Sequence, residues 1–139
     1  MSVTTATLTG APEATRPASL RRTTVAVGAA AAAAVTAVAA AAHAAGVSFE
    51  IEAETIPVVG FAQMTFLGAV LGGLILAGLN RWSRSARTRF LQVTAALTAL
   101  SCVPSVAMPD DAASVITLVA LHVLAAVIIV PALARHARS

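Results

Sequence analysis

Four long apolar segments dominate the hydrophobic pattern of the chain, and short polar stretches separate them. They cover residues 25–46, 58–80, 90–107 and 115–134 and have between 18 and 23 residues each. A helix needs about 20 apolar residues to cross the hydrocarbon core of a bilayer. The pattern therefore predicts an all-α integral membrane protein, an antiparallel four-helix bundle with these segments as its spans.

The charged residues predict the orientation of this bundle. All nine basic residues lie on one side of the four segments, whereas five of the six acids lie on the other. Because basic loops are retained in the cytoplasm, both termini are predicted to be cytoplasmic. Residues 1–24 then form a disordered cytoplasmic tail, residues 25–134 the transmembrane domain, and residues 135–139 a second cytoplasmic tail.

The composition agrees with a membrane protein and argues against other partners. Hydrophobic residues make up 58% of the chain and charged residues 11%, which leaves too little polar surface for a soluble domain. The net charge of +3 needs no nucleic acid, since the arginines are divided among short clusters that flank the membrane. The expected partner is the lipid bilayer, whose anionic head groups the arginines attract. The lack of Lys and Tyr beside abundant Ala and Arg favours a bacterial source, hence the plasma membrane.

The first apolar segment has a second interpretation, as a cleaved signal peptide. Arg21 and Arg22 precede it, and Ala42, His43 and Ala44 match a small-x-small cleavage site. Against this, the segment is longer than the 7–15 apolar residues of a typical signal core. Retention as a span is the prediction, with cleavage as the open alternative.

Acidic residues occupy both predicted outer loops. Glu50, Glu52 and Glu54 alternate with apolar residues, which predicts an extended segment with three carboxylates on one side. Asp110 and Asp111 lie in the other outer loop. Together they form either a solvated acidic surface or a site that attracts Ca²⁺, although the spacing matches no known calcium loop.

Small residues on the second span predict a helix-packing seam. Gly68 and Gly72 lie four residues apart, and Ala69, Gly73 and Ala77 form a neighbouring stripe with the same spacing. Such residues allow another helix to approach closely in lipid. The expected partner is the alanine-rich first helix or a second copy of the protein.

Hydroxyl side chains recur along one face of the third span. Thr94, Thr98, Ser101 and Ser105 are separated by steps of four, three and four residues, which places them within one stripe of a helix. They either line a polar path or bond the carbonyl groups of their own helix.

A histidine in the fourth span is the polar residue most costly to place in lipid. His122 lies near mid-membrane, at the predicted level of Thr98, Ser101 and Cys102. We predict a neutral imidazole bonded to these hydroxyls, serving either proton or ligand handling or only a structural hydrogen bond. His43 lies nearer the outer surface, so the two histidines are not expected to ligate one haem.

Sequence signals for catalysis are lacking. There is no phosphate-binding glycine loop, zinc spacing, nucleophile elbow or intramembrane carboxylate pair. We therefore expect no enzyme activity, no cofactor and no metal.

Short stretches of the sequence suggest a family. Ile56–Phe61 leads into the glycine-rich span, the third span closes on Pro104, and Leu121–His122 precedes the stretch Ile128–Arg135. Over residues 22–136 the chain resembles a group of small actinobacterial four-span membrane proteins of unknown function. The resemblance implies a helical plasma-membrane protein and carries no catalytic residues. The two functional hypotheses are a non-enzymatic packing component, as homo-oligomer or accessory subunit, and a small permease or proton-linked module built on His122.

Overall fold

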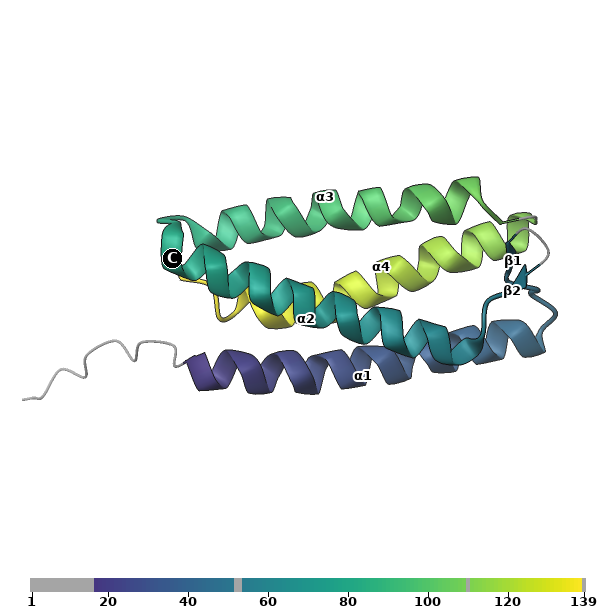
Figure 1. The fold of residues 1–139 in the computed structure, drawn as a ribbon, viewed down its shortest axis with the longest axis horizontal. Helices are drawn as coiled ribbons and strands as arrows, with labels where there is room; N and C mark the ends of the chain where they lie inside the picture. The colour runs from purple at the N-terminus through teal and green to yellow at the C-terminus, as the bar shows by residue number, and fades with distance from the viewer. Residues whose placement is uncertain (1–16, 52–53, 110, 139) are drawn as a thin grey trace, which may run out of the picture.

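The part of the chain that the structure describes forms four long antiparallel helices (Figure 1). The computed structural model describes residues 17–51, 54–109 and 111–138. The helices are α1 (Pro17–Ala44), α2 (Val58–Trp82), α3 (Ala86–Ala107) and α4 (Ala112–Ala134). All four are long and apolar enough to cross a membrane. The predicted all-α helical bundle is confirmed, and its four helices indicate a multi-pass membrane protein.

The helices extend beyond the apolar segments at their polar ends. α1 begins at Pro17 and thus includes residues 17–24, which the sequence analysis placed in a disordered tail. α3 begins at Ala86 and α4 at Ala112, four and three residues before the predicted spans. Arginine is a good helix former, and its long side chain lets the charge reach water while the helix continues. The remainder of the predicted tail, residues 1–16, lies outside the described residues.

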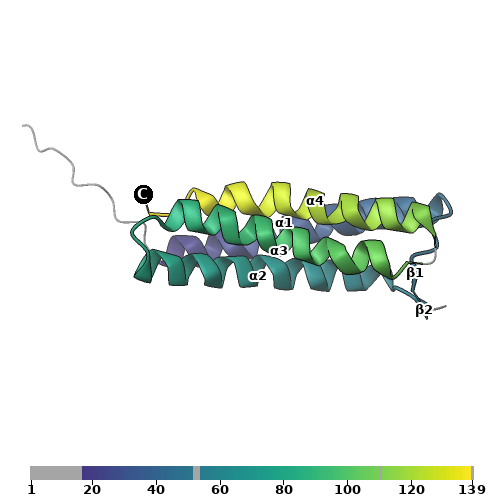
Figure 2. The same cartoon turned by 90° about the horizontal axis from the view of Figure 1, so that it is seen from above.

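The four helices differ in how closely each packs against its neighbours. α1 packs against α2 and α4, and α3 packs against α4, whereas α2 and α3 touch each other little. Figures 1 and 2 show α1 running beside α2 along the length of the bundle. Small residues make this close packing possible: a Cβ added at Gly28 of α1 would lie 3.0 Å from the Cβ of Ala69.

Two clusters of buried side chains form the core. The cluster near the basic end contains Leu76, Phe90 and Leu133 and joins α2, α3 and α4. The cluster near the acidic end contains Phe49 and Leu118 together with residues of α1. Large apolar side chains elsewhere point outwards, as expected of helices that contact lipid.

A short hairpin joins α1 to α2. Gly46, at φ 99°, ends α1, where the Val47 amide donates to the Ala42 carbonyl at 3.0 Å, a common way to close a helix. Strand β1 (Glu50–Ile51) then pairs antiparallel with β2 (Glu54–Thr55). The alternating sequence predicts one extended segment, whereas the structure folds its two halves back on each other.

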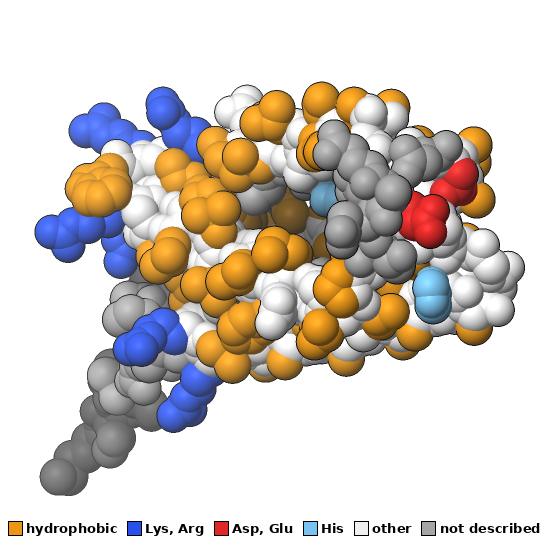
Figure 3. Space-filling model, turned by 45° about the vertical axis from the view of Figure 1, so that its right-hand side comes forward, with side chains coloured by type: hydrophobic (Ala, Val, Ile, Leu, Met, Phe, Trp, Pro, Cys, Tyr) orange, Lys and Arg blue, Asp and Glu red, His pale blue; other side chains and the backbone are white. Residues whose placement is uncertain are grey.

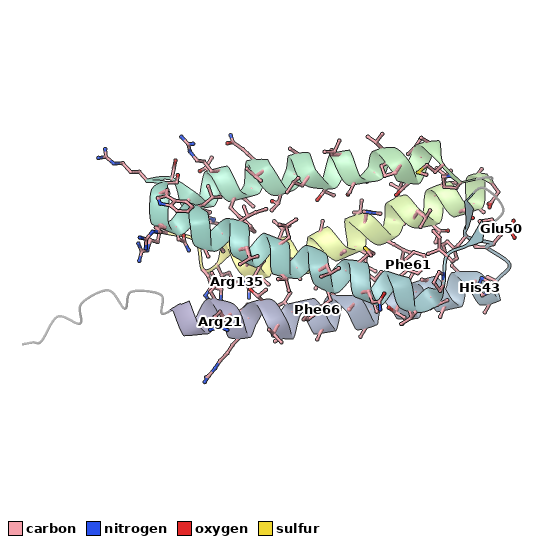
Figure 4. All side chains as sticks on the ribbon, viewed as in Figure 1. Arg21, His43, Glu50, Phe61, Phe66 and Arg135 are labelled. Carbon is pink, nitrogen blue, oxygen red and sulfur yellow. The ribbon has the colours of Figure 1, made fainter. Side chains whose placement is uncertain are left out.

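Basic and acidic side chains lie at opposite ends of the bundle. Figure 3 shows Arg side chains at one end and Asp and Glu side chains at the other, with hydrophobic side chains between them. In Figure 4, Arg21 and Arg135 lie at the first end, and His43 and Glu50 at the second. The start of α1 and the end of α4 thus lie at the same, basic end of the bundle.

Candidate functional site

A groove lies between α2 and α3, with α4 as its floor. Its volume is about 450 Å³, and most of its lining is aliphatic or aromatic, including Phe61, Leu97 and Leu121. The groove exists because α2 packs mainly against α1 and α3 packs mainly against α4, so that α2 and α3 are separated. Figure 3 shows a hollow among hydrophobic side chains on the side of the bundle. This size and lining are typical of a site for an apolar ligand.

His122 of α4 belongs to the floor of the groove. Its Nδ1 lies 2.8 Å from the Leu118 carbonyl oxygen, one helical turn away. A carbonyl oxygen only accepts hydrogen bonds, so Nδ1 carries the proton in this geometry and donates it. Nε2 is then the ring nitrogen left to contact a ligand or a proton.

The hydroxyl stripe of α3 lies along the same groove, yet its bonds stay mostly within α3. Thr98 and Ser101 line the groove, and the Ser101 hydroxyl donates to the Thr98 carbonyl at 2.8 Å. The Thr94 hydroxyl similarly donates to the Phe90 carbonyl at 2.8 Å. Cys102 is half-buried and free, and it is outside the residues that line the groove.

The hydroxyl nearest His122 is that of Ser105, one turn closer to the acidic end than the predicted group. The Ser105 Oγ lies 3.5 Å from His122 Nδ1. Side chains tilt towards the N-terminus of their own helix, and the N-terminus of α4 is at the acidic end. The imidazole therefore reaches past the level of Ser101, which a count of residues along the axis does not capture.

The three predicted packing glycines have three different surroundings. A Cβ added at Gly73 would lie 2.5 Å from Thr24 Oγ1, so Gly73 faces α1. One added at Gly72 would lie 3.3 Å from Leu133 Cδ1 of α4, and one at Gly68 would have nothing within 4 Å. The contact with α1 is thus made by the stripe that contains Ala69 and Gly73, while Gly68 lines the groove.

A polar cluster at the acidic end ties α4 to the α1–α2 connection. Asp111 caps α4 by accepting from the Ser114 amide at 2.8 Å and the Ser114 hydroxyl at 2.6 Å. It also accepts from the Ser48 hydroxyl at 2.9 Å. The Phe49 amide donates to Ser114 Oγ at 3.1 Å. The hydrogen bonds from Ser114 and Ser48 lower the pKa of the Asp111 carboxyl, because they stabilise its charged form.

The predicted acidic surface is only partly described. Asp111 turns towards Ser114 as a helix cap, and Glu50 is exposed to solvent. Glu52 and Asp110 lie outside the described residues. Among the residues that the structure describes, no three His, Cys, Asp or Glu side chains are placed to hold a metal ion.

A second polar cluster closes the basic end. The Asn80 side chain donates to the His136 carbonyl at 3.0 Å and accepts from the Arg138 amide at 2.9 Å. His136 Nε2 lies 3.0 Å from the Thr23 hydroxyl of α1. The sequence analysis placed Asn80 at the end of the second span and the other three residues in the cytoplasmic tails. An Asp directly before an apolar run signals the Asp111 helix cap, but no local signal reveals a contact across 113 residues such as Thr23 with His136.

Comparison with known proteins gives one family. The model of a family of unknown function (DUF6069) matches residues 15–139. No curated protein and no solved structure matches the chain.

Proposed function

Because the chain belongs to this family, whose function is unknown, we propose a role from its own geometry. The protein is a non-enzymatic membrane component whose working surface is the groove between α2 and α3. This groove takes up the apolar part of another membrane molecule. The observation that carries the proposal is the apolar groove of about 450 Å³, in which Gly68 is exposed and an added Cβ would meet no atom within 4 Å.

The proposed location is the plasma membrane of a bacterium of the actinobacterial group, with both termini in the cytoplasm. The gathering of arginines at the end that holds the start of α1 and the end of α4 supports this orientation. Large outward-facing side chains such as Leu74 and Ile116, 65% and 69% exposed, supply the surface that lipid would cover.

Photo-crosslinking tests whether the groove has a defined occupant. A photoreactive residue at Leu97 reports on the groove, and one at Leu74, which is exposed on α2 but does not line the groove, is the matched control. The proposal predicts a discrete adduct from Leu97 and a diffuse pattern from Leu74. Gly68→Leu should abolish the Leu97 adduct by filling the groove, whereas Ala77→Leu, an exposed position on the same helix, should leave it intact. Equal patterns from both positions would overturn the proposal.

A second candidate function is a small permease or proton-linked module. The observation that favours it is the position of His122 on the groove floor, with Nδ1 bonded to the Leu118 carbonyl and Nε2 left as the accepting atom. His122→Leu should then abolish proton flux into vesicles that contain the protein, measured with an internal pH-sensitive dye. If the protein has only the packing role, proton flux stays at the level of empty vesicles both for the unmodified protein and for the variant. The substitution then changes only stability.

A further inference from the structure

The α2–α3 turn places four arginines at one end of the groove. Arg81, Arg84, Arg87 and Arg89 are all exposed, and only residues 83–85 separate the two helices. Phe90, which lines the groove and is 0% exposed, directly follows Arg89. In the described part of the chain, the carboxylates lie at the opposite end of the bundle. An apolar groove therefore runs directly into a basic surface that no carboxylate of the described residues neutralises.

The start of α3 makes this basic surface electrostatically unfavourable by itself. The N-terminus of a helix carries a partial positive charge, and its first amide groups need acceptors. In α3 the cap residue Ser85 makes no side-chain capping bond, and the first turn holds no acidic residue. It holds Arg87 instead, and Arg89 follows two residues later. Like charges thus gather at an uncapped helix terminus, an arrangement that a bound anion would relieve.

Several polar atoms of the groove lining have partners within the protein. Thr94 and Ser101 donate to carbonyl groups of α3, and the Nδ1 of His122 donates to a carbonyl group of α4. A hydrocarbon chain can therefore lie against this lining without leaving those groups unsatisfied.

We propose that the groove is a site for an anionic phospholipid. Its phosphate lies at the start of α3 against Arg87 and Arg89, and one acyl chain lies between α2 and α3. The proposal rests on the role given to the groove above and names the class of its occupant. Charge complementarity favours a lipid over a second copy of this chain, because two copies would bring two basic turns to the same membrane surface.

The test uses the full chain, with the photoreactive residue at Leu97, in vesicles of equal parts phosphatidylglycerol and phosphatidylcholine. We expect phosphatidylglycerol adducts to exceed phosphatidylcholine adducts at least fivefold by mass spectrometry, since one arginine near a membrane contributes a factor of about five. Arg87→Gln with Arg89→Gln should remove this preference. Arg21→Gln with Arg22→Gln, which removes the same charge from the exposed start of α1, should preserve it.

Each other outcome has a distinct meaning. Adducts in the one-to-one ratio of the vesicle would overturn the phospholipid site, as would a preference that survives loss of Arg87 and Arg89. An adduct to a second copy of the chain would also overturn it, yet would keep the groove as a working surface. Labelling from Leu97 that matches labelling from Leu74 would overturn both proposals.

Discussion

The glycines of α2 differ in what a side chain would meet. Thr24 faces Gly73 at 2.5 Å from an added Cβ, and the Thr24 hydroxyl is held by the Leu20 carbonyl at 2.9 Å. Thr24 therefore cannot rotate away without losing a hydrogen bond in a buried site. Gly68 meets nothing within 4 Å. The two positions share a residue type and a helix but differ in tolerance.

Alanine substitution at both positions tests this difference. Gly73→Ala should lower the free energy of unfolding by about 1–3 kcal/mol, the usual cost of overpacking. Gly68→Ala should leave it unchanged or raise it by up to about 1 kcal/mol, because alanine is the better helix former. Thermal unfolding in detergent, followed by circular dichroism, measures both. Similar losses at the two sites would show that Gly68 also packs against protein.

Asp111 gives stability a defined pH dependence. Hydrogen bonds from Ser114 and Ser48 lower its pKa in the folded protein. The resulting stabilisation is complete above the pKa of the unfolded state and is lost as the pH falls through the lower folded pKa. Asp111→Asn should lower the melting temperature at pH 7, and the gap to the unmodified protein should shrink below about pH 4. Glu50→Gln, at an exposed position, should show no such gap. A gap that stays constant down to pH 2 would contradict the role of the Asp111 charge.

The helix that His122 faces was predictable, but the level of its partners along that helix was not. His122 does lie beside the third helix and shares the groove with Thr98 and Ser101. Its hydrogen bonds go to Leu118 and towards Ser105, because the side-chain tilt and the lean of α3 are set by tertiary packing. The role of His136 was not predictable from the sequence, because its contact with Thr23 depends on how the first and last helices pack.

Among the connecting elements, the hairpin between α1 and α2 is anchored by Phe49. This side chain is 0% exposed, and its ring lies 5.1 Å from the ring of Phe61 in an edge-on arrangement. Its backbone has φ 52°, an unusual value for a bulky residue, and both backbone groups are bonded: the amide to Ser114 and the carbonyl to Ile56. The loop conformation is thus held by its contacts.

Phe49→Ala tests this anchor. Alanine has a Cβ like phenylalanine, so the backbone cost at φ 52° is nearly the same for both, and the difference reports side-chain packing. We expect a loss of about 3–5 kcal/mol, typical of removing a buried phenylalanine. Val59→Ala, at a side chain that is 61% exposed, should cost little in the same detergent melt. A small effect at Phe49 would mean that the hairpin does not stabilise the bundle.

Elements with strong hydrophobic patterns were the predictable part of the fold. The four apolar segments gave the four helices, because each is long enough to satisfy its own backbone in lipid. The alternation around Glu50 and Glu54 correctly indicated extended backbone but not the antiparallel pairing of β1 with β2, which depends on the connection of α1 to a neighbouring antiparallel helix. The groove was not predictable either, since it results from the lean of α2 towards α1.

For the whole molecule, the position of α1 bears on whether the first segment is retained. α1 contributes Ala31, Val35 and Ala39 to the core, each at most 2% exposed. Loss of α1 would leave the face of α2 that contains Ala69 and Gly73 without its packing partner. It would also expose Leu121, which is buried in the cluster near the acidic end. A signal peptide is discarded without such consequences, so the packing supports a retained span.

Retention and topology can be measured together. The purified protein should have its full-length mass, and a cysteine at Ala45 should react with a membrane-impermeant reagent from outside the cell. Ala45 is exposed just beyond α1, whereas Ser48 is a poor choice because its hydroxyl bonds Asp111. Cys102 is first replaced by alanine, and a cysteine at exposed Ser85 in the α2–α3 turn is the inward-facing control. A mass lacking residues 1–44 would show that the first span is cleaved. Labelling of Ser85→Cys rather than Ala45→Cys would reverse the predicted orientation in the membrane. In the second case the basic turn would face outwards, and the anionic lipid would have to come from the outer leaflet.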